Sequence, residues 1–228
     1  IFKAVNIRID AGETILLRGA TGGGKSTFLE LCNGLTAPSC GVVRLDGVDL
    51  RNLDVASVRQ KIAYLPEKTV LFRGTILDNL TLFDPARNMD RAMELVVELG
   101  LDRAVARLPG GFATEVGDDL SDLLPQGVRQ QIGIVRALAR QPRIILFDQP
   151  NAGLDMKADQ RLLDLLKRLK GTATLVMVTH RPSYIALADR EVRLQGGRLF
   201  DTAAAPAHIR QMIRAASPGL RLGSADGA

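Results

Sequence analysis

The sequence is poor in aromatic residues and cysteine and has no long apolar run, and each absence removes a class of function. Trp is absent and aromatic residues make up 4% of the chain, so stacking of single-stranded nucleic acid on its side chains is not expected as a main activity. Cys32 and Cys40 form no Cys-x-x-Cys pair and have no His nearby, which favours a reduced cytosolic protein over a metal site. No apolar run reaches the length of a membrane span, and we find no signal peptide.

The composition that remains is that of an ordinary globular protein. Apolar residues make up 46% and charged residues 24% of the 228 residues, which suits one domain, alone or with a small inserted subdomain. The formal net charge is +5, but Arg is scattered, and no block of like charge forms an arm for nucleic acid. We therefore expect a mildly basic, solvated surface and no nucleic-acid partner; contact with anionic lipid headgroups is the alternative.

Hydrophobic periodicity predicts strands that alternate with helices. Strands are predicted at residues 5–9, 14–17, 62–65, 144–147 and 175–178, with hairpins at 42–50 and 191–200. Helices are predicted at 25–32, 55–61, 129–140 and 160–170, and residues 75–108 have a helical pattern punctuated by Pro and Gly. This alternation implies a mainly parallel sheet with flanking helices, an antiparallel β part near the N-terminus and an inserted helical block.

One Gly-rich segment has the pattern of a phosphate-binding loop. Residues 19–26 read Gly-Ala-Thr-Gly-Gly-Gly-Lys-Ser, which fits G-x-x-x-x-G-K-[ST], and they lie between a predicted strand and a predicted helix. Glycines let successive N–H groups face phosphate oxygens, and a helix N-terminus adds partial positive charge. Lys25 would reach the β- and γ-phosphates of ATP, and the Ser26 hydroxyl would ligate Mg²⁺.

Asp148 is the second part of the expected site, because it ends the apolar run at 144–147. A carboxylate at the end of a buried strand is costly unless it is paired or bound to metal-linked water, so we assign it to Mg²⁺. The implied fold is an α/β P-loop NTPase of the RecA-like type. The predicted nucleotide-binding residues are Gly19, Thr21, Gly22, Gly23, Gly24, Lys25, Ser26, Thr27 and Asp148.

These two motifs, with the segments around them, resemble the nucleotide-binding domain of ABC transporters from Ile1 to about Asp201. The resemblance implies that His180 is the switch histidine at the γ-phosphate, and that Asp155 belongs to the D-loop that touches a second such domain. It also implies an ATP-binding core at residues 1–68 and 136–205 and an inserted helical subdomain at 69–135. We expect a C-terminal helix and a disordered tail at 206–228, since Gly, Ser and Ala are abundant there.

Two stretches are similar to ABC exporters in particular. Residues 65–80 resemble the segment after the exporter Q-loop, and residues 108–118 resemble a loop that contacts the membrane domain. The alternative is an amphipathic helix and a Gly-rich loop without a partner. Because the chain begins at Ile1 rather than Met, we expect a transmembrane domain upstream on the same chain, at the cytoplasmic face of the inner membrane. The family's adenine-stacking aromatic would also lie upstream, with Phe2 as a weak substitute.

Two residues of the expected site depart from the family pattern. Gln149 stands where the family has the Glu that activates water; a carboxamide cannot accept the proton, and general base catalysis is worth about 10²–10⁴-fold. We therefore predict ATP binding with slow turnover, whether Gln149 is natural or introduced. Glu67 stands at the Q-loop Gln and would join Ser26 and Asp148 as a metal ligand, but its charge opposes ATP binding unless Mg²⁺ lies between them.

The signature loop departs from the family as well. Counted back from the family-like Arg-Ala-Leu at 136–138, the family's Leu-Ser-Gly-Gly-Gln corresponds to Leu124, Pro125, Gln126, Gly127 and Val128. Pro125 lacks both a hydroxyl and a backbone N–H, and Gln126 is bulkier than Gly beside a phosphate. Another register uses Leu120 and Ser121 with a few inserted residues. Both registers predict weaker γ-phosphate contacts across a dimer.

Together these features favour the motor domain of an ABC exporter, in which ATP-driven closure of a homo- or heterodimer moves a substrate. The alternative is a regulatory or degenerate subunit that closes on ATP and hardly hydrolyses it. A soluble ABC protein of DNA repair or translation is disfavoured, because such proteins usually carry tandem or widely split domains. Contacts with a transported substrate would lie in the membrane domain, and fold similarity alone does not supply its identity.

Overall fold

The fold is built on a six-stranded sheet. Most residues of the expected site follow the carboxyl ends of its parallel strands, which lie on the same side of the sheet. The computed structural model describes residues 2–117 and 124–201. The strands of the sheet are β1 (Thr14–Gly19), β4 (Ile62–Leu65), β7 (Ile144–Asp148), β8 (Thr174–Val178), β9 (Arg190–Gln195) and β10 (Arg198–Asp201). Their order is β10-β9-β1-β8-β7-β4, and every neighbouring pair is parallel except β10 and β9, which form the terminal antiparallel hairpin.

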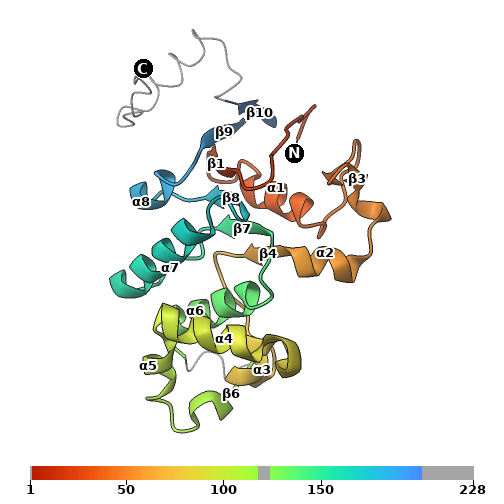
Figure 1. The fold of residues 1–228 in the computed structure, drawn as a ribbon. Coiled ribbons are helices and arrows are strands. Elements are labelled where there is room, and N and C mark those ends of the chain that lie inside the picture. The colour runs from red at the N-terminus through yellow and green to blue at the C-terminus, as the bar shows by residue number, and fades with distance from the viewer. Residues whose placement is uncertain (1, 118–123, 202–228) are drawn as a thin grey trace, which may run out of the picture.

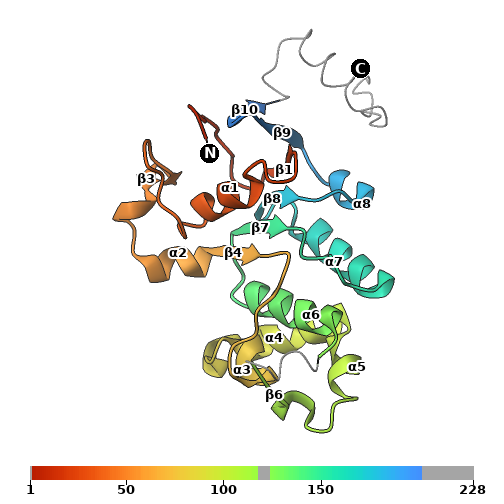
Figure 2. The same ribbon diagram turned by 180° about the vertical axis from the view of Figure 1, so that it is seen from behind.

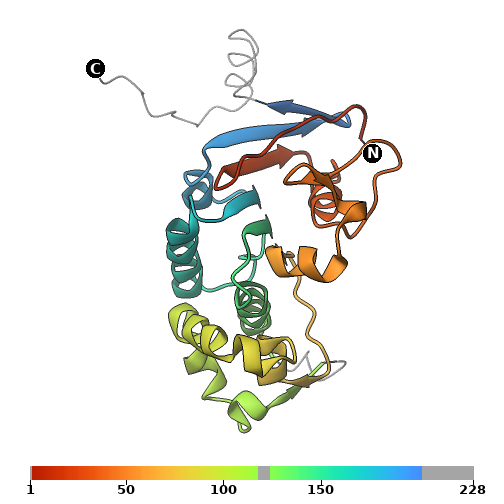
Figure 3. The same cartoon turned by 45° about the vertical axis from the view of Figure 1, so that its right-hand side comes forward.

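Helices cover both faces of this sheet. Figure 3 shows α1 (Lys25–Cys32) and α2 (Val55–Lys61) on one side and α7 (Met156–Leu169) on the other. The strands alternate accordingly: Leu146 and Val176 pack toward α1, whereas Phe147 and Met177 belong to the cluster that contains α7. This period of two explains why the strands read as continuous apolar runs, since both faces of a parallel sheet are buried.

The small elements at the edge of the core are β2 (Arg44–Leu45), β3 (Val48–Asp49), the 3-10 turn η1 (Leu50–Asn52) and α8 (Pro182–Ile185). The strands β2 and β3 form the predicted hairpin, with Asp46 and Gly47 both at positive φ of 51° and 83°. Positive φ at both central residues is the requirement of a tight two-residue turn, and the Asp-Gly dipeptide meets it.

A group of helices packs beyond the β4–β7 edge (Figures 1 and 2). It consists of α3 (Ile76–Thr81), α4 (Pro85–Leu99), α5 (Leu101–Val105) and α6 (Gln126–Leu138), with η2 (Gly111–Ala113) and the short pair β5 (Gly74–Thr75) and β6 (Glu115–Val116). Its apolar side chains join those under α7 in one cluster, in which Leu80, Leu95 and Ile132 are fully buried. Because the helical group and the core share buried side chains, relative movement between them requires repacking of this cluster.

The helical pattern predicted at 75–108 divides into three helices for local reasons. Leu82 and Phe83 have φ of 55° and 59°, and Pro85 then starts α4. Gly100, at φ 74°, ends α4 and leads directly into α5. Left-handed residues and a Pro at the first helical position are the expected stop and start signals.

The predicted strand at residues 5–9 is wrong. Val5, Ile7 and Ile9 are half-buried and alternate with exposed neighbours, and they pack against the α1 side of the core, but the segment forms no strand. β10 pairs with β9 and ends the sheet. Among the described residues, the N–H of Lys3, which precedes the segment, donates to the oxygen of Gly197 in the β9–β10 turn at 2.7 Å. The alternation of apolar and polar residues therefore indicated which side chains are buried, but it did not indicate hydrogen bonding to a neighbouring strand.

The other predicted elements agree closely with the described ranges. The helices at 25–32 and 55–61 and the strand at 62–65 have the bounds of α1, α2 and β4. The helices predicted at 129–140 and 160–170 begin earlier in the structure, as α6 and α7. The C-terminal segment 206–228 and the alternative signature at Leu120 and Ser121 lie outside the described residues. Within residues 2–117 and 124–201, no helix combines the length and the hydrophobicity of a membrane span.

Candidate functional site

The loop between β1 and α1 has the geometry of an anion cradle. Gly22 and Gly24 adopt φ of 72° and 92°, and the Gly23 N–H donates to the Ala20 oxygen at 3.0 Å. A Cβ added at Gly22 would meet no atom within 4 Å, so the space above the loop is open. Gly24 is the N-cap of α1, and it has no side chain to bind the first N–H groups of the helix. The first N–H groups of α1 are thus available to an anion, which the positive end of the helix dipole favours.

Lys25 lies folded across this loop. Its ammonium donates to the backbone oxygens of Gly19 and Ala20 at 3.0 and 2.9 Å. Both acceptors are neutral carbonyls, which phosphate oxygens can replace with stronger, charge-assisted hydrogen bonds. Ser26 is exposed and Thr27 half-buried in the first turn of α1. Their hydroxyls therefore lie in the first turn of α1, beside the open loop, where Ser26 can face a bound metal ion.

Asp148 is a buried carboxylate at the end of β7, 5% exposed. The Tyr64 hydroxyl donates to its Oδ2 at 3.3 Å from the neighbouring strand β4. Burial, and then the adjacent Asp148 charge, raise the pKa of Tyr64, so its hydroxyl stays protonated and can donate. A carboxylate oxygen has about two acceptor sites, and one long hydrogen bond leaves capacity for a metal-bound water. The Ser26 hydroxyl and the buried Asp148 carboxylate are oxygen donors of the kind that Mg²⁺ prefers, so these residue types fit that ion.

The carboxyl ends of the parallel strands bring the remaining predicted residues to the same edge. Leu65 pairs with Phe147, and Asp148 pairs with Val178. Glu67 lies two residues beyond Leu65, and Gln149 lies two residues beyond Phe147, the partner of Leu65. On the next strand, His180 lies two residues beyond Val178. Glu67 and His180 are both exposed. Ligands of open α/β sheets bind at this end of the strands, and the structure thus places these residues and the loop at one edge.

Gln149 is fixed at its backbone. It has a φ of 50°, and its N–H donates to the Val178 oxygen at 3.0 Å. Its side chain is half-buried. A non-glycine residue in the left-handed region is uncommon and often marks a functional position. The carboxamide is accordingly held next to Asp148, but it has no proton-accepting group.

The segment predicted as the signature loop starts α6. Leu124 is buried, and Pro125 caps the helix without any side-chain hydrogen bond. The Pro125 carbonyl accepts from the N–H groups of Val128 and Arg129 at 2.9 and 3.1 Å. The helix therefore forms without the Ser hydroxyl that usually serves as its cap, and this terminus presents no hydroxyl at position 125.

Gln126 and Gly127 pack on the predicted D-loop of the same chain. A Cβ at Gly127 would lie 2.9 Å from the Gly153 oxygen, and Gly153 itself is covered by the Gln126 side chain. The following Asp155 caps α7 by accepting from the Ala158 N–H at 2.8 Å. The signature segment and the D-loop are thus in contact, and glycine is required at position 127 for this approach.

Two buried residues that the sequence analysis missed hold the segment after β4. Gln130, on α6, donates through its Nε2 to the Pro66 oxygen at 2.9 Å, while its Oε1 accepts from the Thr69 N–H at 3.3 Å. Asn79, on α3, makes two hydrogen bonds with the backbone of Phe72: its Oδ1 accepts from the Phe72 N–H, and its Nδ2 donates to the Phe72 oxygen, both at 2.8 Å. A buried amide within an apolar helix face was the available signal, since buried polar groups need partners.

Phe2 does not lie free beside the cradle. Its ring packs edge-on against Phe28 of α1, with the ring centroids 6.4 Å apart. Phe28 is 6% exposed and belongs to the core on the α1 side of the sheet. The aromatic pair therefore contributes to the packing behind the loop.

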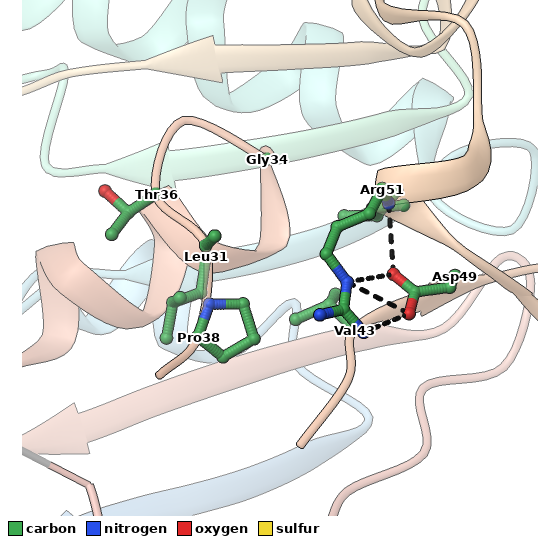
Figure 4. A pocket seen from close by; sticks show the side chains of 9 residues that line it. Leu31, Gly34, Thr36, Pro38, Val43, Asp49 and Arg51 are labelled. Carbon is green, nitrogen blue, oxygen red and sulfur yellow. Dashed lines mark hydrogen bonds and ion pairs between the residues drawn. The ribbon is translucent and has the colours of Figure 1, made fainter. Parts of the chain in front are cut away.

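A cavity of about 80 Å³ lies at the other end of α1 (Figure 4). Leu31, at the C-terminal end of that helix, and Val43, before the β2–β3 hairpin, are among its lining residues. Its charged groups satisfy one another: Asp49 accepts from Arg51 at 2.6 Å, and Arg51 lowers the pKa of Asp49 to about 2. A small cavity at the negative end of a helix dipole, with a paired acid, is not suited to phosphate.

Comparisons with known proteins agree with this geometry. The model of the ABC transporter family matches residues 2–152. A mycobactin import ATP-binding/permease protein of Mycolicibacterium smegmatis is 36% identical over 201 residues, which are 88% of this chain and 35% of that protein. A multidrug efflux ATP-binding/permease protein of Mycobacterium tuberculosis is 34% identical over 201 residues, 88% of this chain and 17% of that protein.

A solved structure is similar over nearly the whole chain. The structure of a bacterial Atm1-family ABC exporter with ATP bound superposes with a TM-score of 0.80 at 27% identity, covering 97% of this chain and 40% of that chain. The chain spans about a third or less of the length of the two curated relatives described above. The shared part is the one that carries the loop, Asp148 and His180.

Proposed function

Since the chain belongs to the ABC transporter family, we propose that it binds Mg²⁺-ATP between the loop at 20–24 and Asp148 and acts as the motor domain of an exporter. The observation that carries this proposal is the strand–loop–helix with uncapped N–H groups and Lys25 above them. Lys25 would move from two neutral carbonyls to the β- and γ-phosphates. Mg²⁺ bound with ATP neutralises part of the phosphate charge, with Ser26 and Asp148 as its protein contacts and Glu67 facing it from the segment after β4.

Turnover by this domain is slow in the proposed mechanism. His180 and Gln149 lie at adjacent strand ends, where the γ-phosphate and the attacking water would be placed. His180 donates to the γ-phosphate, and the Gln149 carboxamide orients water by hydrogen bonding but cannot remove its proton. ATP would therefore persist in the closed state. This same feature favours the second candidate, a regulatory or degenerate subunit that closes on ATP and hardly turns over.

A second nucleotide-binding domain is the proposed partner at the face that carries α6 and α7. The N-terminus of α6 is exposed at Pro125 and Gln126, and Met156, next to the D-loop residue Asp155, is 86% exposed. An apolar side chain so exposed beside the site is suited to burial in an interface. ATP held by Lys25 of one domain would then meet the start of α6 of the other.

The transmembrane domain is proposed to dock on the segment after β4 and on α3, at the cytoplasmic face of the membrane. Val70, Phe72 and Phe83 are 72%, 48% and 53% exposed there. The Arg136 guanidinium lies 4.5 Å from the centroid of the Phe72 ring, and a Cβ at Gly74 would lie 3.1 Å from the Phe83 ring. These exposed apolar groups lie on the segment after β4 and directly after α3, which Asn79 and Gln130 hold in place, and this supports transmission of movement to the site.

Nucleotide binding tests the core of the proposal. Calorimetric titration of the chain with Mg²⁺-ATP should give saturable binding that Lys25→Ala weakens by at least about tenfold, as expected for loss of charge-assisted hydrogen bonds. Lys167→Ala is the matched control, because Lys167 pairs with Asp164 on the outer side of α7. Equal binding by Lys25→Ala and the wild-type chain would refute the proposed site.

Membrane association tests the docking surface. Replacement of Phe72 and Phe83 by Ser should leave Mg²⁺-ATP binding unchanged and should reduce retention of the domain on membranes that contain the transporter's membrane domain. Val97→Ser is the control, because Val97 is a comparably exposed apolar residue, 63% exposed, on α4 and not on the segment after β4 or on α3. Undiminished retention of the Phe variants would exclude this docking surface.

A further inference from the structure

Four polar side chains form a cluster behind His180. Asp159, in the first turn of α7, accepts at its Oδ1 from the Asn151 amide at 3.0 Å and from the Tyr184 hydroxyl at 2.8 Å. Its Oδ2 pairs with Arg181, whose guanidinium also donates to the Asn151 backbone oxygen at 3.4 Å. One carboxylate on α7 thus joins three donors from two other segments, the loop after β7 and the start of α8.

Three members of the cluster are removed from solvent, and the fourth reaches the surface. Tyr184 is fully buried, Asn151 is 3% exposed and the Asp159 side chain is 14% exposed, whereas the Arg181 side chain is 42% exposed. The Tyr184 ring packs on Phe147, with centroids 5.3 Å apart and planes inclined by 36°. Burial, and then the hydrogen bond to Asp159, raise the pKa of Tyr184, so the hydroxyl remains a donor. A buried polar network of this kind is rigid only while each member keeps its partners.

The position of the cluster ties it to the site. Asn151 follows Gln149 by two residues, and Arg181 directly follows His180. The ladder between β7 and β8 ends at Asp148 and Val178, and the Gln149 N–H adds one further bond to Val178. Beyond that point, contacts of Asp159 with Asn151 and Arg181 join the two segments. The carboxylate therefore fixes the direction in which the chain leaves β8, and with it the place of His180.

We propose that Asp159, supported by Tyr184, Asn151 and Arg181, is a positioning residue that holds His180 at the γ-phosphate of bound ATP. The inference rests on the proposed nucleotide site. ADP lacks the γ-phosphate, so the cluster acts on the preference for ATP over ADP and not on nucleotide affinity in general. Asp159 touches neither nucleotide nor water in this role; it acts through Arg181 on the neighbouring His180.

Nucleotide preference tests the inference directly. Dissociation constants of Mg²⁺-ATP and Mg²⁺-ADP are measured for the wild-type chain, Asp159→Asn and Tyr184→Phe. Asp159→Asn keeps the shape and removes the charge, and Tyr184→Phe keeps the ring and removes the hydroxyl. Each should reduce the ATP-over-ADP preference by about five- to tenfold, with ADP affinity unchanged, since hydrogen bonds to charged groups are the strong ones. Asp164→Asn on the same helix is the control, because Asp164 contacts only Gln160 and Lys167 among the described hydrogen bonds.

A double-variant cycle separates positioning from a merely structural role. In a His180→Ala background, Asp159→Asn should cause no further loss of preference, because the residue through which it acts is gone. A structural role would instead weaken ATP and ADP equally and would do so with or without His180. Either that pattern or an unchanged preference in Asp159→Asn and Tyr184→Phe overturns the inference.

The outcomes for the wild-type chain distinguish this inference from the function on which it rests. A chain that binds neither nucleotide refutes the proposed site itself. A chain that binds ATP and ADP equally keeps the nucleotide site and refutes the positioning of His180. If Asp159→Asn fails to fold, Tyr184→Phe provides the same comparison without a change of charge.

Discussion

Conversion of Gln149 to Glu should turn a slow domain into a faster ATPase. The two side chains have nearly the same shape, and the backbone at this position is already fixed by its φ of 50° and by the N–H bond to Val178 at 3.0 Å. The substitution therefore adds a proton acceptor next to Asp148 without requiring a new backbone conformation. If the remaining site is competent, steady-state Mg²⁺-ATP hydrolysis should rise by about 10²–10⁴-fold.

The substitution changes two separate quantities, the activation free energy of hydrolysis and the free energy of unfolding. A rise of about 10²–10⁴-fold corresponds to about 2.7–5.4 kcal/mol of activation free energy. Two carboxylates about 6–8 Å apart repel by roughly 2–3 kcal/mol at an effective dielectric constant of about 20, and Asp148 is only 5% exposed. The variant should therefore melt at a lower temperature than wild type without Mg²⁺, and Mg²⁺-ATP should restore the difference by placing positive charge between the acids.

The assay compares steady-state phosphate release with ATP affinity for wild type, Gln149→Glu and Gln149→Asn. The Asn variant is the control, because Asn tolerates a positive φ and retains a carboxamide without a proton-accepting group. Gln149→Glu alone should gain rate, while all three bind ATP. If all three bind ATP and none turns over, the reasoning that Gln149 limits catalysis is refuted, and the altered signature or a missing partner domain limits the rate. A degenerate or regulatory subunit would then be the better description.

Three further perturbations have defined outcomes. Pro125→Ser should tighten ATP-dependent dimer formation by about tenfold per site, measured by light scattering, because it restores a hydroxyl that can bind a charged phosphate; an unchanged dimer constant would exclude α6 from the interface. Alkylation at pH 8 should modify exposed Cys40 and spare Cys32, since burial raises the pKa of the Cys32 thiol to about 12; equal labelling in peptide mass spectra would contradict this. Although partial burial opposes it, the 2.6 Å pair with Lys170 lowers the pKa of Asp189, so Asp189→Asn should cost below about 1 kcal/mol at pH 7. That stabilisation is present above the unfolded pKa of about 3.9 and is lost as pH falls through the lower folded value, so the difference in melting temperature between wild type and variant should shrink as the pH is lowered below that range.

Local sequence patterns predicted much of the fold because neighbouring residues determine the backbone conformation of a helix start or a turn. The helix at 25–32 follows glycines that adopt positive φ, and the helix at 55–61 begins at Asp54, whose carboxylate accepts from the Ser57 N–H at 2.8 Å. The segment at 5–9 has equally clear alternation, yet it forms no strand. Whether an extended segment joins a sheet depends on whether the rest of the chain brings it alongside a strand, which its own alternation does not encode, and the described sheet ends at β10.

The candidate site was predicted where its chemistry is contained in a short stretch. The loop at 20–24, Lys25 and Ser26 act through consecutive N–H groups and side chains, so their spacing in the sequence is their spacing in space. Gln149 was identified in the same way, by the residue type directly after a buried strand. Helix starts were less accurate, since α7 begins at Met156 because Asp155 accepts from Ala158, a contact that the apolar pattern does not encode.

The sequence by itself determined the phosphate loop, the acid at the end of β7 and the absence of a base at position 149, because each depends on residue type and local order. Only the tertiary structure decided that Tyr64 donates to Asp148 and that Asp159 joins Arg181 to Asn151. The Tyr64–Asp148, Asp159–Arg181 and Asp159–Asn151 pairs are separated by 84, 22 and 8 residues along the chain. They meet through strand order, strand register and the packing of α7 and α8. Long-range contacts of this kind follow from how the whole chain buries its apolar surface, which no single segment specifies.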